Sequence, residues 1–168
     1  IHQLNPALLD TRLQPENLSG QIELQGDQTV RQGRIQLHDK SSKLAFDAML
    51  SQCNHTITIE SLDLSHGNAR VSGRGYLQLD ADQPFTFEGM LKQFDLSALI
   101  DVPHSNLNAN FQLNGHLIPQ PAGKIDYTIT PSHFDKQPVM GKGVITLSQI
   151  NQLRHLAADA ELRLGDNL

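Results

Sequence analysis

The sequence predicts an all-β protein: an elongated, curved and mainly antiparallel sheet folded into an open groove with an apolar interior. Apolar and polar residues alternate along most of the 168-residue chain. Turn-forming residues interrupt the alternation about every ten residues, and a longer unit repeats about every 90 residues. Because side chains on a strand point alternately to the two faces of a sheet, a period of two gathers the apolar side chains on one face.

The alternating apolar residues are the candidate lining of this groove. They occur at every second position within each predicted strand and share one parity there. Such a chain builds one long apolar surface and no obvious pocket for chemistry. The predicted lining consists of Ile22, Leu24, Ile35, Leu37, Leu44, Phe46, Leu50, Ile57, Ile59, Val71, Leu77, Leu79, Phe85, Phe87, Leu107, Phe111, Leu113, Ile125, Tyr127, Ile129, Ile145, Leu147, Leu162 and Leu164.

Two copies of a longer unit are visible in the sequence, which we place at residues 1–90 and 91–168 of one domain spanning 1–168. Repetition of this kind is typical of elongated architectures in which each unit covers its neighbour. A short piece that does not itself alternate precedes the strand in both copies, with one residue of slip: Asn5-Pro6-Ala7-Leu8 in the first and Asp95-Leu96-Ser97-Ala98-Leu99 in the second. Three segment pairs align: 18–26 with 107–115, 33–37 with 123–127, and 3–8 with 93–99.

We predict about ten strands and one or two short helical turns, in the following order. A helical turn is predicted at residues 4–9. Asn5-Pro6 places a proline early in it, and proline is favoured in the first turn of a helix. A second turn at residues 95–100 begins with Asp95 as N-cap and ends before Val102-Pro103. Strands fill the remaining chain, separated by breaks at residues 26–27, 39–42, 52–54, 66–68, 80–84, 119–121, 137–138 and 165–167.

Several glycines share the parity of their apolar neighbours and are therefore predicted to lie on the apolar face. Glycine at such a position leaves a gap in the side-chain layer and lets the sheet bend. A curved sheet with a partly empty concave face tolerates these gaps better than a filled core does. The glycines concerned are Gly20, Gly73, Gly75, Gly89, Gly115 and Gly143.

Composition and motifs argue against several classes of function. The net charge is −5 and the 13 Lys and Arg are scattered, so we expect no nucleic-acid partner. The pairs Gly73/Gly75 and Gly141/Gly143 begin like a dinucleotide fingerprint, but strand patterns follow them where a helix is needed. No nucleophile elbow and no zinc-type spacing of His with the lone Cys53 occurs. We therefore expect no enzyme activity, catalytic residue, metal or cofactor.

The order of several short motifs resembles the repeating segments of the TamB family, the translocation and assembly module proteins of the AsmA-like superfamily. The resemblance covers nearly the whole chain. Residues 84–99 read PFTFEGMLKQFDLSAL, and residues 107–115 read LNANFQLNG. Residues 132–143 read SHFDKQPVMGKG, and residues 162–167, LRLGDN, are similar to the family's L-x-L-G-x-N.

This resemblance implies a hydrophobic β-groove, the β-taco, in the periplasm of a Gram-negative bacterium. TamB-like proteins are anchored in the inner membrane by an N-terminal helix, and their C-terminal end engages TamA, an outer-membrane barrel protein. They are implicated in phospholipid transport between the membranes, in outer-membrane biogenesis and in protein secretion. The implied partners are phospholipid acyl chains, a TamA-like barrel and unfolded outer-membrane proteins. Because the chain begins at Ile1, without an initiator Met or a signal peptide, we expect it to be a piece of a longer protein, and the resemblance implies that this piece is periplasmic.

Two functions stay open at this point. The first is a lipid-conducting groove that shields acyl chains. The second is a chaperone-like scaffold that guides barrel or autotransporter substrates by β-strand addition without transporting lipid. An enzyme or a sugar-binding β domain is disfavoured by the motif search.

Overall fold

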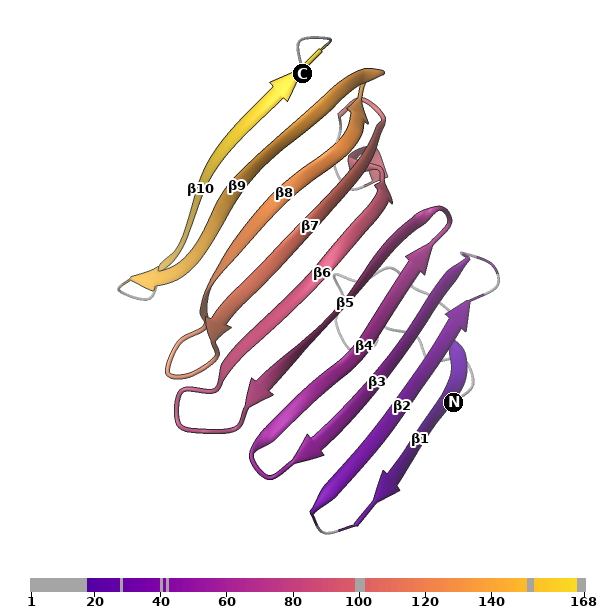
Figure 1. The fold of residues 1–168 in the computed structure, drawn as a ribbon, viewed down its shortest axis with the longest axis vertical. Helices are drawn as coiled ribbons and strands as arrows, with labels where there is room; N and C mark the ends of the chain where they lie inside the picture. The colour runs from indigo at the N-terminus through magenta and orange to yellow at the C-terminus, as the bar shows by residue number, and fades with distance from the viewer. Residues whose placement is uncertain are drawn as a thin grey trace.

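The computed structural model describes residues 18–27, 29–39, 41, 43–98, 102–150 and 153–165. They form ten strands and one 3₁₀ turn (Figure 1). The elements are β1 (Ser19–Gly26), β2 (Val30–Asp39), β3 (Leu44–Cys53), β4 (Thr56–His66), β5 (Ala69–Gln78), β6 (Pro84–Phe94), η2 (Leu96–Ala98), β7 (Ser105–His116), β8 (Ala122–Phe134), β9 (Gln137–Ile150) and β10 (Leu153–Leu164).

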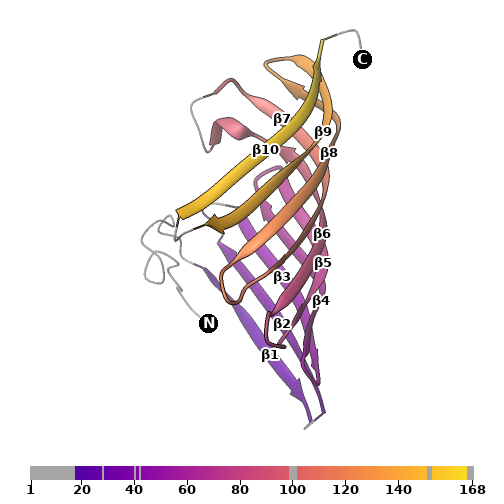
Figure 2. The ribbon, with the colours of Figure 1, turned by 90° about the vertical axis from the view of Figure 1, so that its left-hand side faces the viewer.

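All ten strands belong to one open, uncurled sheet, in which every strand pairs antiparallel with its neighbours in the sequence. Strands β1 and β10 are the two edges. Figure 2 shows the strand direction turning steadily from β1 to β10, which is the usual twist of a sheet. The predictions of an all-β fold, of antiparallel pairing and of about ten strands are confirmed.

Short turns connect the strands, mostly at the predicted breaks. One predicted break is wrong: Gln137 and Pro138 already belong to β9, and the turn from β8 consists of Asp135 and Lys136. Both turn residues have positive φ, 46° and 65°. Two successive residues in this region form the type I′ turn, whose twist matches that of antiparallel strands. The sequence prediction placed the turn at the proline. Pro138 is instead near the start of β9, where a strand tolerates proline.

Three strands carry an extra residue. The register slips between Ile59 and Leu62 in β4, between Leu91 and Phe94 in β6, and around residues 129–132 in β8. In each of these strands two residues lie opposite one residue of the partner strand, which is a β-bulge. A bulge increases the local twist and reverses the parity of every side chain that follows it.

The predicted helical turn at residues 95–100 is observed as η2, a single 3₁₀ turn. The Oδ1 atom of Asp95 accepts hydrogen bonds from the backbone N–H of Ser97 (3.1 Å) and of Ser105 (2.9 Å), so Asp95 caps the turn as predicted. The other predicted turn, at residues 4–9, lies outside the described residues. Within the described ranges, no helix has the length and apolar character needed to span a membrane.

Candidate functional site

The predicted lining residues come together on one face of the sheet, which we call the apolar face. It consists of three cross-strand rows that run from β1 to β10. The first row is Gly20, Leu37, Phe46, Leu64, Val71, Leu91, Ala109, Ile129, Gly141 and Leu162. The second is Ile22, Ile35, Ala48, Leu62, Gly73, Gly89, Phe111, Tyr127, Gly143 and Ala160. The third is Leu24, Gly33, Leu50, Ile59, Gly75, Phe87, Leu113, Ile125, Ile145 and Ala158.

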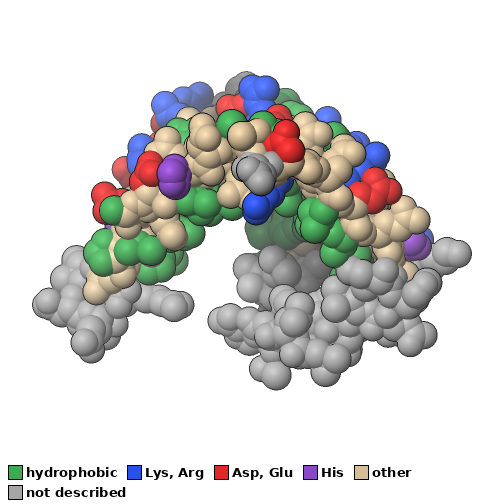
Figure 3. Space-filling model, turned by 90° about the horizontal axis from the view of Figure 1, so that it is seen from below, with side chains coloured by type: hydrophobic (Ala, Val, Ile, Leu, Met, Phe, Trp, Pro, Cys, Tyr) green, Lys and Arg blue, Asp and Glu red, His purple; other side chains and the backbone are tan. Residues whose placement is uncertain are grey.

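No charged side chain interrupts these rows. Figure 3 shows hydrophobic side chains gathered on the lower side of the molecule, while Lys, Arg, Asp and Glu lie mostly on the upper side. The remaining predicted residues extend the face at both ends of the strands. They are Leu44, Ile57, Leu77, Leu79, Phe85, Leu107, Leu147 and Leu164.

Aromatic side chains cover several glycines of the apolar face. A Cβ atom on Gly73 would lie 2.6 Å from Cζ of Phe87, and one on Gly89 would lie 2.8 Å from Cζ of Phe111. The Phe87 and Phe111 rings stack with their centroids 5.9 Å apart. The prediction that these glycines lie on the apolar face is confirmed. The prediction that they leave gaps is wrong at Gly73 and Gly89, because rings from neighbouring strands fill the space there.

Most side chains of the apolar face are partly exposed to solvent. Among the described hydrophobic residues, just Leu18, Ala48 and Val139 are less than a tenth exposed. The largest exposures on this face are at the edges, at Leu24 (81%) and Leu156 (73%). The chain exposes 11976 Å² in total, whereas a compact monomer of this mass exposes about 8,200 Å². The described residues form a single sheet, and a single layer leaves more surface exposed than two packed layers do.

Several apolar-face residues were missed by sequence reasoning, among them four leucines. Leu62, Leu64 and Leu91 lie in the continuous rows, and Leu156 lies opposite Leu147. Leu62 and Leu64 follow the β4 bulge, so their parity no longer matches that of Ile57 and Ile59. Apolar residues spaced by three, as Ile59 and Leu62 are, give the signal that could have located the bulge.

The opposite face, which we call the polar face, carries charged side chains paired between and along strands. Arg34 lies 2.9 Å from Asp47. Side-chain hydrogen bonds from Arg34 and Gln36 lower the pKa of the Asp47 carboxyl. A second pair joins Arg70 to Asp63, and the hydrogen-bonded Asp63 carboxylate raises the pKa of Arg70. The other ion pairs are Arg74–Glu88, Lys124–Asp126, Lys142–Glu161 and Arg163–Glu161.

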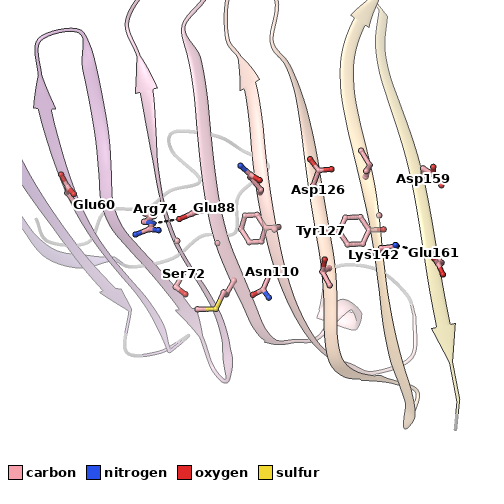
Figure 4. A pocket seen from close by; sticks show the side chains of 18 residues that line it. Glu60, Ser72, Arg74, Glu88, Asn110, Asp126, Tyr127, Lys142, Asp159 and Glu161 are labelled. Atoms are coloured by element: carbon pink, nitrogen blue, oxygen red, sulfur yellow. Dashed lines mark hydrogen bonds and ion pairs between the residues drawn. The ribbon is translucent and has the colours of Figure 1, made fainter. Parts of the chain in front are cut away.

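A broad hollow of about 960 Å³ lies on the polar face, over β4 to β10 (Figure 4). Its charged side chains include Glu60, Arg74, Asp126, Lys142 and Asp159. Arg74 pairs with Glu88 and Lys142 with Glu161, so these two cations are already neutralised. Sequence reasoning did not find the hollow, because its lining comes from strands far apart in the chain and carries no compact motif.

Asp95, Ser97 and His104 form a cluster between η2 and β7. The Nδ1 atom of His104 lies 2.8 Å from Oδ2 of Asp95 and 3.0 Å from Oγ of Ser97. Hydrogen bonds from His104 and then Ser105 hold the pKa of the Asp95 carboxyl well below its usual range. A serine-histidine-aspartate relay uses the two different ring nitrogens, and here both partners contact the same one. The cluster links η2 to the start of β7.

Within the described ranges, no group of three or more His, Cys, Asp or Glu side chains is placed to hold a metal ion. Comparison of the chain with protein-family models, with curated proteins and with solved structures finds no match.

Proposed function

We propose that the chain is a periplasmic segment of an envelope-spanning protein of the TamB type, and that its apolar face shields phospholipid acyl chains. The observation that carries the proposal is the unbroken set of apolar rows across all ten strands, with few buried hydrophobic side chains. A protein that only needed a core would bury this surface against a second layer. A surface that must pass lipid has to stay accessible.

An acyl chain suits such a surface. Each methylene group removed from water contributes about 0.8 kcal/mol, so a continuous apolar face holds lipid without a specific headgroup site. Ten strands spaced by about 4.8 Å extend over roughly 50 Å. That length is one section of a route between two membranes. In this proposal the sheet bends into an open groove whose inner wall is the apolar face.

The family resemblance supplies the setting of the proposal. The parent protein is anchored in the inner membrane of a Gram-negative bacterium, contacts a TamA-like outer-membrane barrel protein, and supports outer-membrane protein assembly. The order of the motifs at residues 84–99, 107–115 and 132–143 supports this assignment. One of these motif positions, Ser132, is 2% exposed and fills the β8 bulge, so part of the motif has a structural purpose.

Photocrosslinking in cells tests the proposal. A benzophenone amino acid placed on the apolar face of the parent protein should capture phospholipid, whereas the neighbouring polar-face position should not. Loss of the difference between the faces would contradict the proposal. The inner positions are Leu24, Leu79, Leu113 and Ile129, and the matched controls are Gln25, Gln78, Gln112 and Thr128.

A second candidate is the scaffold that guides outer-membrane barrel or autotransporter substrates by strand addition. The observation that favours it is the open sheet, in which each described strand pairs with its neighbours in the sequence, a pattern that an added strand can continue. The same experiment separates the two functions. Protein adducts at the apolar positions, without lipid adducts, would favour the scaffold.

A further inference from the structure

The turns between the strands lie at two opposite ends of the sheet, because consecutive strands are antiparallel and alternate turns share an end (Figure 1). One end, which we call the lysine rim, consists of the described residues within 39–43, 66–69, 92–105 and 134–137. The other end, which we call the aspartate rim, consists of the described residues within 26–31, 53–56, 79–84 and 116–122. A ligand that lies along the strands on the apolar face therefore runs from one rim toward the other.

Three lysines of the lysine rim are not neutralised. Among the described lysines, only these three form no ion pair with a described carboxylate, and their side chains are exposed. They are Lys43, Lys92 and Lys136. The other two described lysines, Lys124 and Lys142, pair with carboxylates of the polar face. An exposed cation without a partner attracts an anion from outside the chain.

Lys92 also lies next to a second cation. It is directly opposite Arg70, which pairs with Asp63 on its other side. Toward β7, the β6 bulge faces Asn108, whose Oδ1 atom accepts a hydrogen bond from the N–H of Gln93 (3.1 Å). Like charges directly opposite one another destabilise a sheet. An anion bound at Lys92 offsets this repulsion.

Lys43 and Lys136 occupy turn positions that do not favour lysine. Their φ angles are 57° and 65°, in the left-handed region where glycine and asparagine are preferred. Asp135 and Lys136 form the turn from β8 to β9, and a type I′ turn favours Asp-Gly at these two places. Other residues would therefore suit the backbone better. Such positions point to a purpose of the side chain.

The aspartate rim has the opposite character. It carries Asp27, Asp80 and Asp82, and Arg31 is the Lys or Arg among its described residues. An anion is therefore repelled from several positions at this end of the sheet.

Carboxylates also occur on the lysine rim, but two of the three described ones are bonded within their own connections. Oδ1 of Asp39 accepts hydrogen bonds from the N–H (2.7 Å) and the hydroxyl (2.5 Å) of Ser41. Oδ2 of Asp95 lies 2.8 Å from Nδ1 of His104. The third is Asp135. The ammonium groups of the three lysines stay available to an anion.

These lysines border the apolar face. Lys43 precedes Leu44 and Lys92 follows Leu91, and both leucines belong to that face. A lysine stem lies along apolar surface while its ammonium group stays in water. The rim therefore suits a molecule that joins an anionic group to a hydrocarbon chain.

We propose that anionic phospholipids lie on the apolar face with their phosphates at Lys43, Lys92 and Lys136, and with their acyl chains along the strands toward the aspartate rim. This inference rests on the proposed function and adds the class of headgroup and the orientation. A strand of 11 residues, such as β6, spans about 36 Å. An acyl chain of one bilayer leaflet spans about 15 Å, so the chain ends reach the middle of the strands, where Phe87 and Phe111 stack.

The three lysines attract separate headgroups. Lys43 directly precedes β3, Lys92 lies in β6, and Lys136 directly precedes β9. Three strand spacings separate each from the next, which is about 14 Å. That distance exceeds the Debye length of about 8 Å at physiological ionic strength.

Titration calorimetry with two short-chain phospholipids tests the headgroup site. The natural chain should bind the anionic phosphatidylglycerol more tightly than a phosphatidylcholine with the same acyl chains. The variant Lys43→Asn/Lys92→Gln/Lys136→Gly should lose about fivefold in affinity for phosphatidylglycerol, since each lysine acts on one headgroup. Its affinity for phosphatidylcholine should not change. Its Tm should be no lower than that of the natural chain, because asparagine and glycine suit the two left-handed turn positions.

The matched variant Arg31→Gln/Lys124→Gln/Lys142→Gln removes the same number of cations elsewhere and should keep the affinity for phosphatidylglycerol. An equal loss in both variants, or no loss in the first, would overturn the headgroup site while lipid binding stands. Binding of neither phospholipid by the natural chain would overturn the proposed function, and the orientation with it.

A spin-labelled lipid tests the orientation. The lone cysteine, Cys53, is exposed on the aspartate rim and can carry a fluorophore there. The variant Cys53→Ser/Asn68→Cys moves the fluorophore to the turn between β4 and β5, on the lysine rim. Phosphatidylethanolamine with a nitroxide on its amine should quench the fluorophore at position 68 and leave the one at Cys53 bright. Equal quenching at both rims, or quenching only at Cys53, would overturn the orientation.

Discussion

At the scale of single residues, aspartates fix the ends of the strands. In the turn between β1 and β2, Oδ1 of Asp27 accepts hydrogen bonds from the N–H of Thr29 (2.7 Å), the hydroxyl of Thr29 (2.7 Å) and the N–H of Val30 (2.9 Å). These bonds, with that from Val30 the largest contribution, lower the pKa of Asp27 from 3.8 to about 2. Asp95 plays the same part before β7.

The pKa of Asp27 predicts a pH dependence of stability. Because the folded-state pKa lies below the ordinary value, the stabilisation is present above pH 3.8 and is lost as the pH falls through about 2. Asp27→Ala should therefore lower the free energy of unfolding at neutral pH, and the difference from the natural chain should shrink across that window. Urea unfolding at a series of pH values measures it. A difference between the two proteins that stays constant from neutral pH down to about pH 1 would contradict this account.

The glycines beneath the aromatic rings predict a steric effect. Gly89→Ala places a Cβ 2.8 Å from Cζ of Phe111 and 2.7 Å from the carbonyl oxygen of Ser72. Overpacking of this kind costs about 1–3 kcal/mol. Gly123→Ala is the matched control, because its Cβ would approach no atom closer than 3.1 Å. Denaturant unfolding should show a larger loss for Gly89→Ala, and equal losses would contradict the steric account.

At the scale of the elements, the bulges decide which side chains reach each face. The β8 bulge is filled by Ser132, whose hydroxyl accepts a hydrogen bond from the N–H of Asn108 (2.7 Å) and lies 2.7 Å from the carbonyl oxygen of Thr130. The side chain thereby replaces backbone pairing that the extra residue interrupts. The bulge depends on this one buried hydroxyl.

Removal of that hydroxyl should destabilise the sheet. Ser132→Ala removes the hydrogen bond from the N–H of the half-buried Asn108, which costs about 1 kcal/mol. Thr146→Ala, on the exposed polar face of β9, should change stability by less than about 0.5 kcal/mol. Thermal and denaturant unfolding measure both variants. A neutral Ser132→Ala would show that the bulge does not need the hydroxyl.

The same bulges mark the limit of prediction from the sequence. Alternation correctly placed residues such as Leu24, Leu113 and Ile145 on one face, because parity is local and needs no knowledge of neighbouring strands. It missed Leu62 and Leu64, since a bulge resets parity and alternation alone does not reveal one. The polar-face hollow was not predictable either, because its lining depends on the register of seven strands at once.

At the scale of the whole molecule, the chain exposes more surface than a compact protein of its mass. Its apolar rows are continuous, but most of their side chains are only partly buried. Folding therefore gains less from hydrophobic burial than in a two-layer domain. A ligand that covers the apolar face adds the missing burial, and it stabilises the folded state by mass action.

The stability of the purified chain should therefore rise with lipid. A phospholipid or mild detergent present at 100 times its dissociation constant adds about 2.7 kcal/mol to the free energy of unfolding and raises Tm accordingly. The double variant Leu24→Asp/Leu156→Asp should reduce this rise, because both positions lie on the apolar face. Both side chains are largely exposed, so their replacement should cost little stability without lipid. The matched variant Gln25→Asp/Ala157→Asp, on the polar face, should keep the full rise. An unchanged Tm with lipid, or an equal rise in both variants, would count against a lipid-binding apolar face.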